Sequence, residues 1–242
     1  MLLLDVGNSR SKWALVQEGE LTHQGVAANA EWTELQRAFA VLPAPSRIVA
    51  SNVAGDAMAQ RLREICAGWK CMVEFVTARA EQCGVRNGYQ QPERLGSDRW
   101  AALIAAWGRL HGPCLVVNCG TATTIDALSA QGEFLGGLIL PGVELMQRSL
   151  ATGTAQLTGE PGMLQDFPRN TADAIYSGML RATVGAVRHQ FDLLLARSPY
   201  GSVHCLLGGG AAGVVEPYLD LPLERMDNLV LKGLQIIGEW KA

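Results

Sequence analysis

The chain has 242 residues, 48% of them hydrophobic and 18% charged, and its formal net charge is −3 at pH 7. This length fits one large domain or two domains of about 120 residues each, and the apolar fraction is sufficient for a packed core. The charge is slightly negative and no basic stripe occurs, so we do not expect nucleic acid as a partner. No apolar run of about 18 residues occurs, so we expect no membrane span.

The cysteines and the N-terminus bear on the cellular compartment. No CxxC pair occurs, and the four histidines are scattered. In a chain of this length, such a pattern favours reduced thiols over a disulfide framework or a zinc site. The first apolar run has no basic residues before it and is interrupted at Asp5, which is not typical of a secretion signal. We therefore expect a cytoplasmic protein.

The first predicted element is a hairpin in LLLDVGNSRSKWALV, residues 2–16, where an apolar strand ends on an acid and small polar residues lead into a second strand. The amide N–H groups of Gly7, Asn8 and Ser9 could converge on an anion, as in the concave backbone nests that bind phosphate. Asp5 could hold Mg²⁺ through a water molecule, and Lys12 could reach a phosphate. An ordinary hairpin with a solvated lysine is the alternative.

The next segments alternate between strand and helix patterns. RIVASNV and MVEFVT are typical of buried strands, and GDAMAQRLREICAGW and GSDRWAALIAAWGRLHGP of helices. The second of these helices is predicted to have Ser97 as its N-cap and to end at the HGP sequence. Strands that alternate with helices predict an α/β fold.

The start of that second helix has an unusual pair of charges. An acid in the first turn, here Asp98, is favourable to the helix dipole, and this alone could explain it. Arginine in a first turn has no such benefit, so Arg99 suggests a ligand, and its planar guanidinium suits a carboxylate. An acid that accepts a hydroxyl proton beside an arginine that holds a carboxylate describes a kinase for a hydroxy acid.

The opening hairpin recurs 113 residues later in LVVNCGTATTIDAL, residues 115–128. At this constant offset Asp5 aligns with Asn118, Gly7 with Gly120, and the pair 14–15 with the pair 127–128. Such a repeat predicts two similar domains that together clamp the phosphates of a nucleotide. Chance similarity of two apolar strands is the alternative, and the threonine hydroxyls of the second copy are also common in ordinary strands.

The remaining chain continues the alternation. Residues 170–197 have the periodicity of a long helix, residues 202–214 predict a strand that enters a glycine turn, and residues 228–240 predict a closing helix. GGGAAG at 208–213 matches the dinucleotide fingerprint, but too few residues follow it for the further strand–helix units of a dinucleotide-binding domain. Close approach to a flat ligand and a helix-packing turn both remain open.

Five motifs in this order and spacing resemble those of the type III pantothenate kinases, namely DVGNSRSKW, GSDRW, NCGTATTID, GGLILPG and NTADAI. The resemblance covers nearly the whole chain and places it in the actin and acetate/sugar-kinase superfamily. It implies an α/β fold of duplicated ribonuclease-H-like domains, residues 1–111 and 112–242, that face a central nucleotide cleft. The implied activity is ATP-dependent phosphorylation of pantothenate to 4′-phosphopantothenate, the first step of coenzyme A biosynthesis.

The resemblance also implies roles for particular residues. The family's first ATP loop corresponds to Asp5, Val6, Gly7, Asn8, Ser9, Arg10, Ser11 and Lys12, and its second ATP-loop threonine to Thr121. Its pantothenate contacts correspond to Tyr89, Gly96, Ser97, Asp98, Arg99 and Thr171. Asp98 matches the catalytic base, and Thr171 matches a residue contributed across a homodimer interface. Where the family usually has an aspartate for a monovalent cation, K⁺ or NH₄⁺, this chain has Asn118.

The mechanism expected from this resemblance needs mainly positioning and charge. The two loops and Mg²⁺ would spread the charge of the γ-phosphate while Asp98 accepts the hydroxyl proton, and a carboxylate of ordinary pKa would suffice. The rival hypothesis is a non-catalytic accessory regulator on the same nucleotide-binding fold, against which the presence of Asp98 argues. A sugar kinase or ATPase of the same superfamily is a further alternative, against which Arg99 argues because it suits an acidic substrate.

Overall fold

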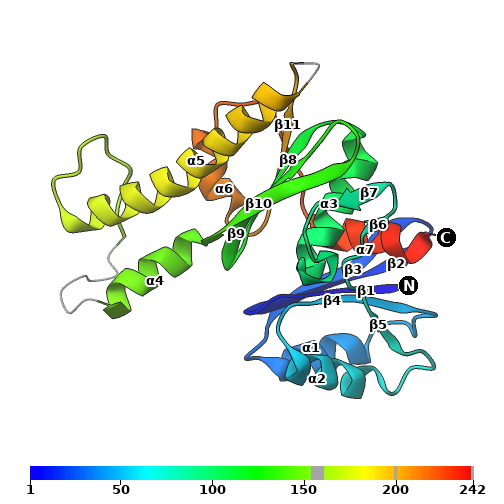
Figure 1. The fold of residues 1–242 in the computed structure, drawn as a ribbon. Helices are drawn as coiled ribbons and strands as arrows, with labels where there is room; N and C mark the ends of the chain where they lie inside the picture. The colour runs from blue at the N-terminus through cyan, green and yellow to red at the C-terminus, as the bar shows by residue number, and fades with distance from the viewer. Residues whose placement is uncertain (154–160, 199–200, 241–242) are drawn as a thin grey trace. The chain divides into compact units, whose positions relative to one another are not determined.

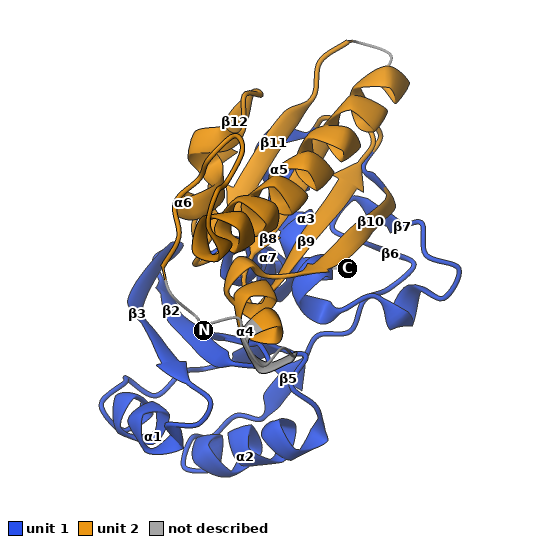
Figure 2. Ribbon diagram, turned by 90° about the vertical axis from the view of Figure 1, so that its left-hand side faces the viewer, with its two compact units in different colours: residues 1–111, 132–134, 228–242 blue, residues 112–131, 135–227 orange. Residues whose placement is uncertain are grey.

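The computed structural model describes residues 1–153, 161–198 and 201–240. The chain divides into two compact units, coloured separately in Figure 2. Unit 1 consists of residues 1–111, 132–134 and 228–242, and unit 2 of residues 112–131 and 135–227. The last residues of the chain therefore belong to the same unit as the first.

The sheet of unit 1 has the order β3-β2-β1-β4-β5. Its strands are β1 (Leu2–Val6), β2 (Arg10–Gln17), β3 (Glu20–Ala28), β4 (Ile48–Asn52) and β5 (Val73–Phe75). The central strand β1 runs antiparallel to β2 and parallel to β4. Two small strands, β6 (Glu81–Gln82) and β7 (Val85–Asn87), and a 3-10 turn at Pro92–Arg94 follow β5. This mixed sheet confirms the predicted α/β class.

Helices cover both faces of this sheet (Figure 1). Leu2, Leu4 and Val6 of β1 belong to a core cluster that includes residues of α1 (Trp32–Ala40) and α2 (Asp56–Cys66). Because successive side chains of a strand point to opposite faces, Leu3 and Asp5 face the other side. On that side lie α3 (Ser97–Leu110) and α7 (Leu229–Glu239), which pack together. Asp5 is thus the one polar residue of the otherwise apolar strand β1, on the face that α3 covers.

Unit 2 repeats this strand order. Its strands are β8 (Cys114–Cys119), β9 (Ala122–Leu128), β10 (Glu133–Pro141), β11 (His204–Gly208) and β12 (Leu223–Arg225). The first two residues of β10 belong to unit 1. Their order is β12-β11-β8-β9-β10. From β10 to β12, this is the order of the first sheet, with β8 to β12 in the places of β1 to β5. Its helices are α4 (Val143–Gly153), α5 (Thr171–Arg197) and α6 (Ala212–Val215), followed by a 3-10 turn at Glu216–Tyr218. The predicted repeat of a strand–turn–strand unit is confirmed.

The constant offset of 113 residues is wrong beyond the turn. Leu2 pairs with Leu15 in the first hairpin, whereas Leu115, its counterpart, pairs with Ala127. The reason is the length of the turn: residues 7–10 separate the last paired residues of the first hairpin, and residues 120–122 those of the second. After the turn the offset is therefore one residue smaller, and Leu15 corresponds to Ala127.

The helix predictions are largely confirmed, with one correction at a cap. Helix α3 begins at Ser97 and ends before His111, whose backbone is left-handed at φ 46°. The predicted N-cap role of Ser97 is wrong, because the N-cap is Gly96 and Ser97 is already helical. The hydroxyl of Ser97 instead shares a 2.8 Å hydrogen bond with that of Ser51. A side-chain cap occurs at α5, where Asn170 accepts a hydrogen bond from the amide of Asp173 at 2.8 Å.

Candidate active site

The first candidate loop connects β1 to β2. The amide of Gly7 donates to the carbonyl of Arg10 at 3.1 Å and closes the turn, so the prediction that this amide points at an anion is wrong. Asp5 pairs with Lys12 across the two strands. The side chains of Asn8, Ser9 and Arg10 are exposed, whereas Ser11 is buried. The loop therefore presents a short run of accessible backbone beside the acid that ends β1.

Asp5 and Asp98 form an acidic pair in unit 1. Burial, reinforced by the negative charge of Asp98 and opposed by Lys12, raises the pKa of Asp5 to about 7. Burial also raises the pKa of Asp98, although the amide and the positive charge of Arg99 oppose this shift. Asp98 Oδ1 accepts a hydrogen bond from the amide of Arg99 at 2.8 Å, which fixes the carboxylate at the helix start. Burial thus raises the pKa of both carboxyl groups, and the charge of Asp98 adds to this effect at Asp5.

Gly96 and Ser97 hold Asp98 in place. A Cβ atom at residue 96 would lie 2.6 Å from Oδ1 of Asp98, so any larger residue would displace that carboxylate. The buried hydroxyls of Ser97 and Ser51 join the start of α3 to β4. Ser51 is the direct neighbour of Asp5 in the parallel pairing of β4 with β1. The position of the helix start is therefore coupled to the strand that carries Asp5.

The side chain of Arg99 extends from the start of α3 to an aromatic cluster, which consists of Tyr89 and Phe134. Its guanidinium donates through Nη1 to the hydroxyl of Tyr89 at 2.8 Å, and its Cζ lies 5.7 Å from the ring centroids of both Tyr89 and Phe134. These two rings are themselves 5.3 Å apart. Arg99 is only 6% exposed, so its charge is held in a largely dehydrated, cation–π environment. The structure thus brings together Tyr89 and Arg99, two residues that the sequence assigned to the same substrate.

The second candidate loop lies in unit 2, between β8 and β9. Gly120 donates to the carbonyl of Ala122 at 3.0 Å, and Asn118 pairs with Thr124 on one side and Gly208 on the other. Gly142 donates to the carbonyl of Thr121 at 2.9 Å, and a Cβ atom at residue 142 would overlap the carbonyl of Gly120. The GGLILPG motif therefore ends on a glycine because the second loop packs directly against it.

The glycine turn at 208–213 packs against the same region. Gly209 has φ 95°, and a Cβ atom there would overlap the backbone of Cys119. The amide of Ala211 donates to the carbonyl of Cys119 at 3.0 Å, and α6 begins directly afterwards. Of the two alternatives that the sequence left open, these contacts favour the packing turn. Gly210 has no atom within 4 Å of an added Cβ, so its side of the turn has room.

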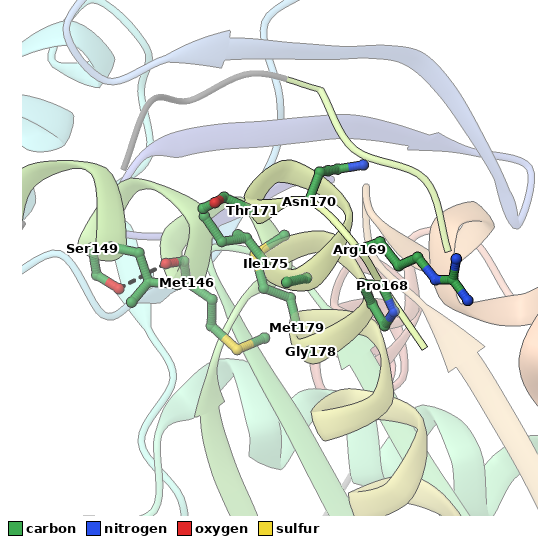
Figure 3. Close-up of a pocket in the computed structure, with 11 residues that line it drawn as sticks. Met146, Ser149, Pro168, Arg169, Asn170, Thr171, Ile175, Gly178 and Met179 are labelled. Atoms are coloured by element: carbon green, nitrogen blue, oxygen red, sulfur yellow. Dashed lines mark hydrogen bonds between the residues drawn. The ribbon is translucent and has the colours of Figure 1, made fainter. Parts of the chain in front are cut away.

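Thr171 lies at the start of α5 and lines a groove of about 810 Å³ (Figure 3). The groove lies between α4 and the N-terminal half of α5. Its lining is mostly apolar and consists of Met146, Ser149, Leu150, Pro168, Arg169, Asn170, Thr171, Ala174, Ile175, Gly178 and Met179.

Several residues of the candidate site had no recognisable signal in the sequence. Phe134 is fully buried beside Arg99 and Tyr89, but its sequence context is that of any strand residue. Asn29 and Ser51 contact the first loop and the start of α3 through side-chain hydrogen bonds. Among the described residues, no group of three or more histidine, cysteine or acidic side chains could hold a metal ion. In the same part of the chain, no helix is long and apolar enough to cross a membrane.

Comparison with solved structures defines the class of the fold. A protein of Campylobacter jejuni described as a Baf family transcriptional activator is 22% identical with a TM-score of 0.62, covering 99% of this chain and 98% of its own. A protein of Sinorhizobium meliloti described as a 2-dehydro-3-deoxygalactonokinase is 15% identical with a TM-score of 0.62, covering 98% of this chain and 97% of that protein. At these identities the likeness concerns the fold alone, which is the actin-like fold found in sugar kinases.

Sequence comparison identifies the family. A family model described as type III pantothenate kinase matches residues 1–192. The type III pantothenate kinase of Nitrosospira multiformis is 47% identical over 238 residues, covering 98% of this chain and 90% of the relative. That of Aromatoleum aromaticum is 45% identical over 242 residues, covering 100% and 99%. The chain belongs to the type III pantothenate kinases, a family of phosphotransferases.

Proposed function

We propose that this protein transfers the γ-phosphate of ATP to the 4′ hydroxyl of pantothenate through the residues described above. The observation that carries the proposal is the start of α3, where Asp98 sits beside Asp5 and the next residue, Arg99, enters the aromatic cluster. A proton acceptor and a carboxylate-binding group at adjacent positions suit a substrate that carries both a hydroxyl and a carboxylate. The accessory-regulator alternative gains no support from this arrangement, because a regulator needs no base.

We assign nucleotide binding to the two loops, residues 5–12 and Thr121, and to Mg²⁺ near Asp5. The residues of unit 1 suit such an ion, because the pKa of Asp5 is raised by burial and by the charge of Asp98, and a divalent cation would relieve both effects. Mg²⁺ prefers oxygen ligands and keeps several waters, so one carboxylate is a sufficient protein contribution. When bound, the ion would neutralise part of the phosphate charge.

Asp98 serves as the general base. The sequence-based expectation was a carboxylate of ordinary pKa, but burial raises the pKa of Asp98. A raised pKa makes the carboxylate a stronger proton acceptor while it remains ionised above that pKa, which suits general base catalysis. The 4′ hydroxyl would give its proton to the carboxylate of Asp98 as its oxygen bonds to the γ-phosphorus, and ADP would leave.

Arg99 and Tyr89 recognise the carboxylate of pantothenate. Arginine binds a carboxylate in a bidentate manner, and low exposure strengthens the charge interaction. The hydroxyl of Tyr89 accepts a hydrogen bond from the guanidinium of Arg99. The rings of Tyr89 and Phe134 stabilise the positive charge of this guanidinium by cation–π interactions. Gly96 and Ser97 complete this substrate region because they set the position of α3.

Asn118 stands at the position of the proposed monovalent-cation site. Asn118 supplies a carbonyl oxygen but no charge, so a K⁺ or NH₄⁺ ion beside the phosphates would be held weakly in this protein.

We also propose a homodimer in which Thr171 contributes to the pantothenate site of the neighbouring subunit. The apolar groove at the start of α5 and exposed apolar side chains such as Ile139, Met163 and Phe167 support an interface in unit 2.

Two further proposals concern the chain as a whole. Residues 1–111 and 112–242 contain the sheets of two copies of a duplicated ribonuclease-H-like domain, as the matching strand orders suggest, and α7 packs back on the first copy. The protein works in the cytoplasm, where its six cysteines stay reduced; in the structure all six are free.

The test is phosphate transfer from ATP to pantothenate by the purified protein, with glucose and glycerol as control acceptors. We expect ADP formation only with pantothenate. Transfer to glucose or glycerol would favour a sugar kinase, and nucleotide binding without any transfer would favour the regulator. Sedimentation at assay concentration tests the assembly, and an active monomer would refute the homodimer and the role of Thr171 in it.

A further inference from the structure

The carbonyl groups of the first loop are held by a residue outside the loop motif. Asn29, directly after β3, donates through Nδ2 to the carbonyl of Gly7 at 2.7 Å. Its Oδ1 accepts from the hydroxyl of Ser11 at 2.8 Å, and its amide donates to the carbonyl of Ser9 at 2.9 Å. One residue therefore binds the loop at three places, at the start, in the middle and where β2 begins.

These contacts determine which way the loop amides point. The C=O and N–H groups of one planar trans peptide point in opposite directions. When Asn29 holds the carbonyls of Gly7 and Ser9 on its own side, the amides of Asn8 and Arg10 are directed to the opposite side. Amides that point to one side of a turn in this way are the donors from which anion-binding nests are built. An unrestrained turn of small residues would lose conformational entropy upon binding phosphate, and this bracing reduces that loss.

We propose that Asn29 is a positioning residue for nucleotide binding, which holds the loop of residues 7–10 in its phosphate-binding conformation before ATP arrives. The inference rests on the proposed role of this loop in binding ATP. Asn29 touches neither substrate in this proposal and acts only through the loop. Its effect should therefore appear in the affinity for ATP and leave the affinity for pantothenate unchanged, because the pantothenate contacts lie on α3 and at Tyr89.

The test compares Asn29→Ala with a matched control from the same hairpin. The hydroxyl of Thr22 also has side-chain hydrogen bonds, with the carbonyl of Leu15 at 3.0 Å, Gln17 at 2.9 Å and His23 at 3.2 Å, but at the other end of the β2–β3 pairing. Thr22→Val removes these bonds and leaves the loop untouched. ATP affinity is measured by calorimetry with MgCl₂, KM values for both substrates by ADP release, and stability by thermal unfolding without ligands.

For Asn29→Ala we expect ATP to bind about tenfold more weakly, the combined effect of two lost hydrogen bonds of ordinary strength. The KM for pantothenate should stay within about twofold, and Thr22→Val should bind ATP like the wild type. Ser11→Ala, which removes one of these bonds, should show a smaller loss, and the double variant should be no worse than Asn29→Ala because both act through one network.

Three results would overturn the inference. One is an ATP affinity of Asn29→Ala within about twofold of the wild type. Another is a loss of ATP affinity in Thr22→Val as large as that in Asn29→Ala when both variants are equally destabilised. If the wild type itself binds no ATP, the proposed function of the loop fails as well, and this is measured first. Should Asn29→Ala not fold, Asn29→Asp, which keeps the acceptor for Ser11 but loses the donor to the carbonyl of Gly7, decides by the same criteria.

Discussion

Replacement of Asp5 by asparagine should stabilise the protein at alkaline pH while it abolishes activity. The carboxyl of Asp5 has its pKa raised from 3.8 to about 7 by burial and by the charge of Asp98. The folded protein therefore binds this proton more tightly than the unfolded chain does. As the pH rises from about 4 to about 7, the unfolded chain releases the proton first, and stability falls by about 1.4 kcal/mol per pH unit from this group.

Above pH 7 the accumulated cost is about 3 pKa units, or up to about 4 kcal/mol. The asparagine side chain carries no charge to dehydrate, so Asp5→Asn should regain most of this energy at pH 8 and little at pH 4.5. For a chain of this size, 1 kcal/mol corresponds to about 2–4 °C in Tm, so the expected rise at pH 8 is on the order of 10 °C.

The assay is thermal unfolding in EDTA without nucleotide at pH 4.5, 6 and 8. Asp56→Asn, which changes an exposed acid in the first turn of α2, is the matched control and should show no such pH-dependent gain. Addition of Mg²⁺ and ATP should stabilise the wild type more than Asp5→Asn. A variant less stable than the wild type at pH 8, or a difference that does not change with pH, would refute the reasoning.

Three further substitutions test the other groups. Asp98→Asn should lower kcat by about 10²–10⁴ and leave ATP binding intact, because it removes a base and keeps the shape; a near-normal kcat would leave Asp98 with only a structural role at the helix start. Arg99→Lys should raise KM for pantothenate far more than for ATP, because lysine keeps the charge but loses the bidentate geometry; equal effects on both would place Arg99 at the phosphates. Asn118→Asp should be activated by K⁺ at lower concentrations than the wild type in KCl titrations at constant ionic strength, because it restores a charge; a wild type saturated at low K⁺ would contradict this.

The sequence was informative wherever a local pattern has one structural solution. The two apolar segments with Asp5 and Asn118 near their ends were predicted as the first strands of hairpins, and the start at Ser97 and the end at HGP predicted α3 almost to the residue. The cap of α3 was missed because serine is a common N-cap, and nothing local indicates that Ser97 instead bonds to Ser51, 46 residues earlier.

The parts that the sequence could not supply depend on contacts between distant residues. Asn29 lies 22 residues from Gly7, and an asparagine after a strand predicts only a turn. Phe134 contacts Tyr89 and Arg99 because β10 pairs with β7. The sequence of residues 85–87 is too short to predict this pairing. The raised pKa of Asp98 follows from burial, which a sequence motif does not contain.

The place of α7 has a consequence for how the chain folds during synthesis. This last helix packs on α3 so closely that a Cβ atom at Gly233 would overlap the carbonyl of Ala101, and it also contacts β1 and β4. While the ribosome is still translating residues 112–227, the face of the first sheet that carries Leu3 lacks part of its cover. Until α7 has been synthesised, we therefore expect this part of unit 1 to expose apolar surface, and its closure by α7 requires contacts with β1 of high sequence separation, which form slowly.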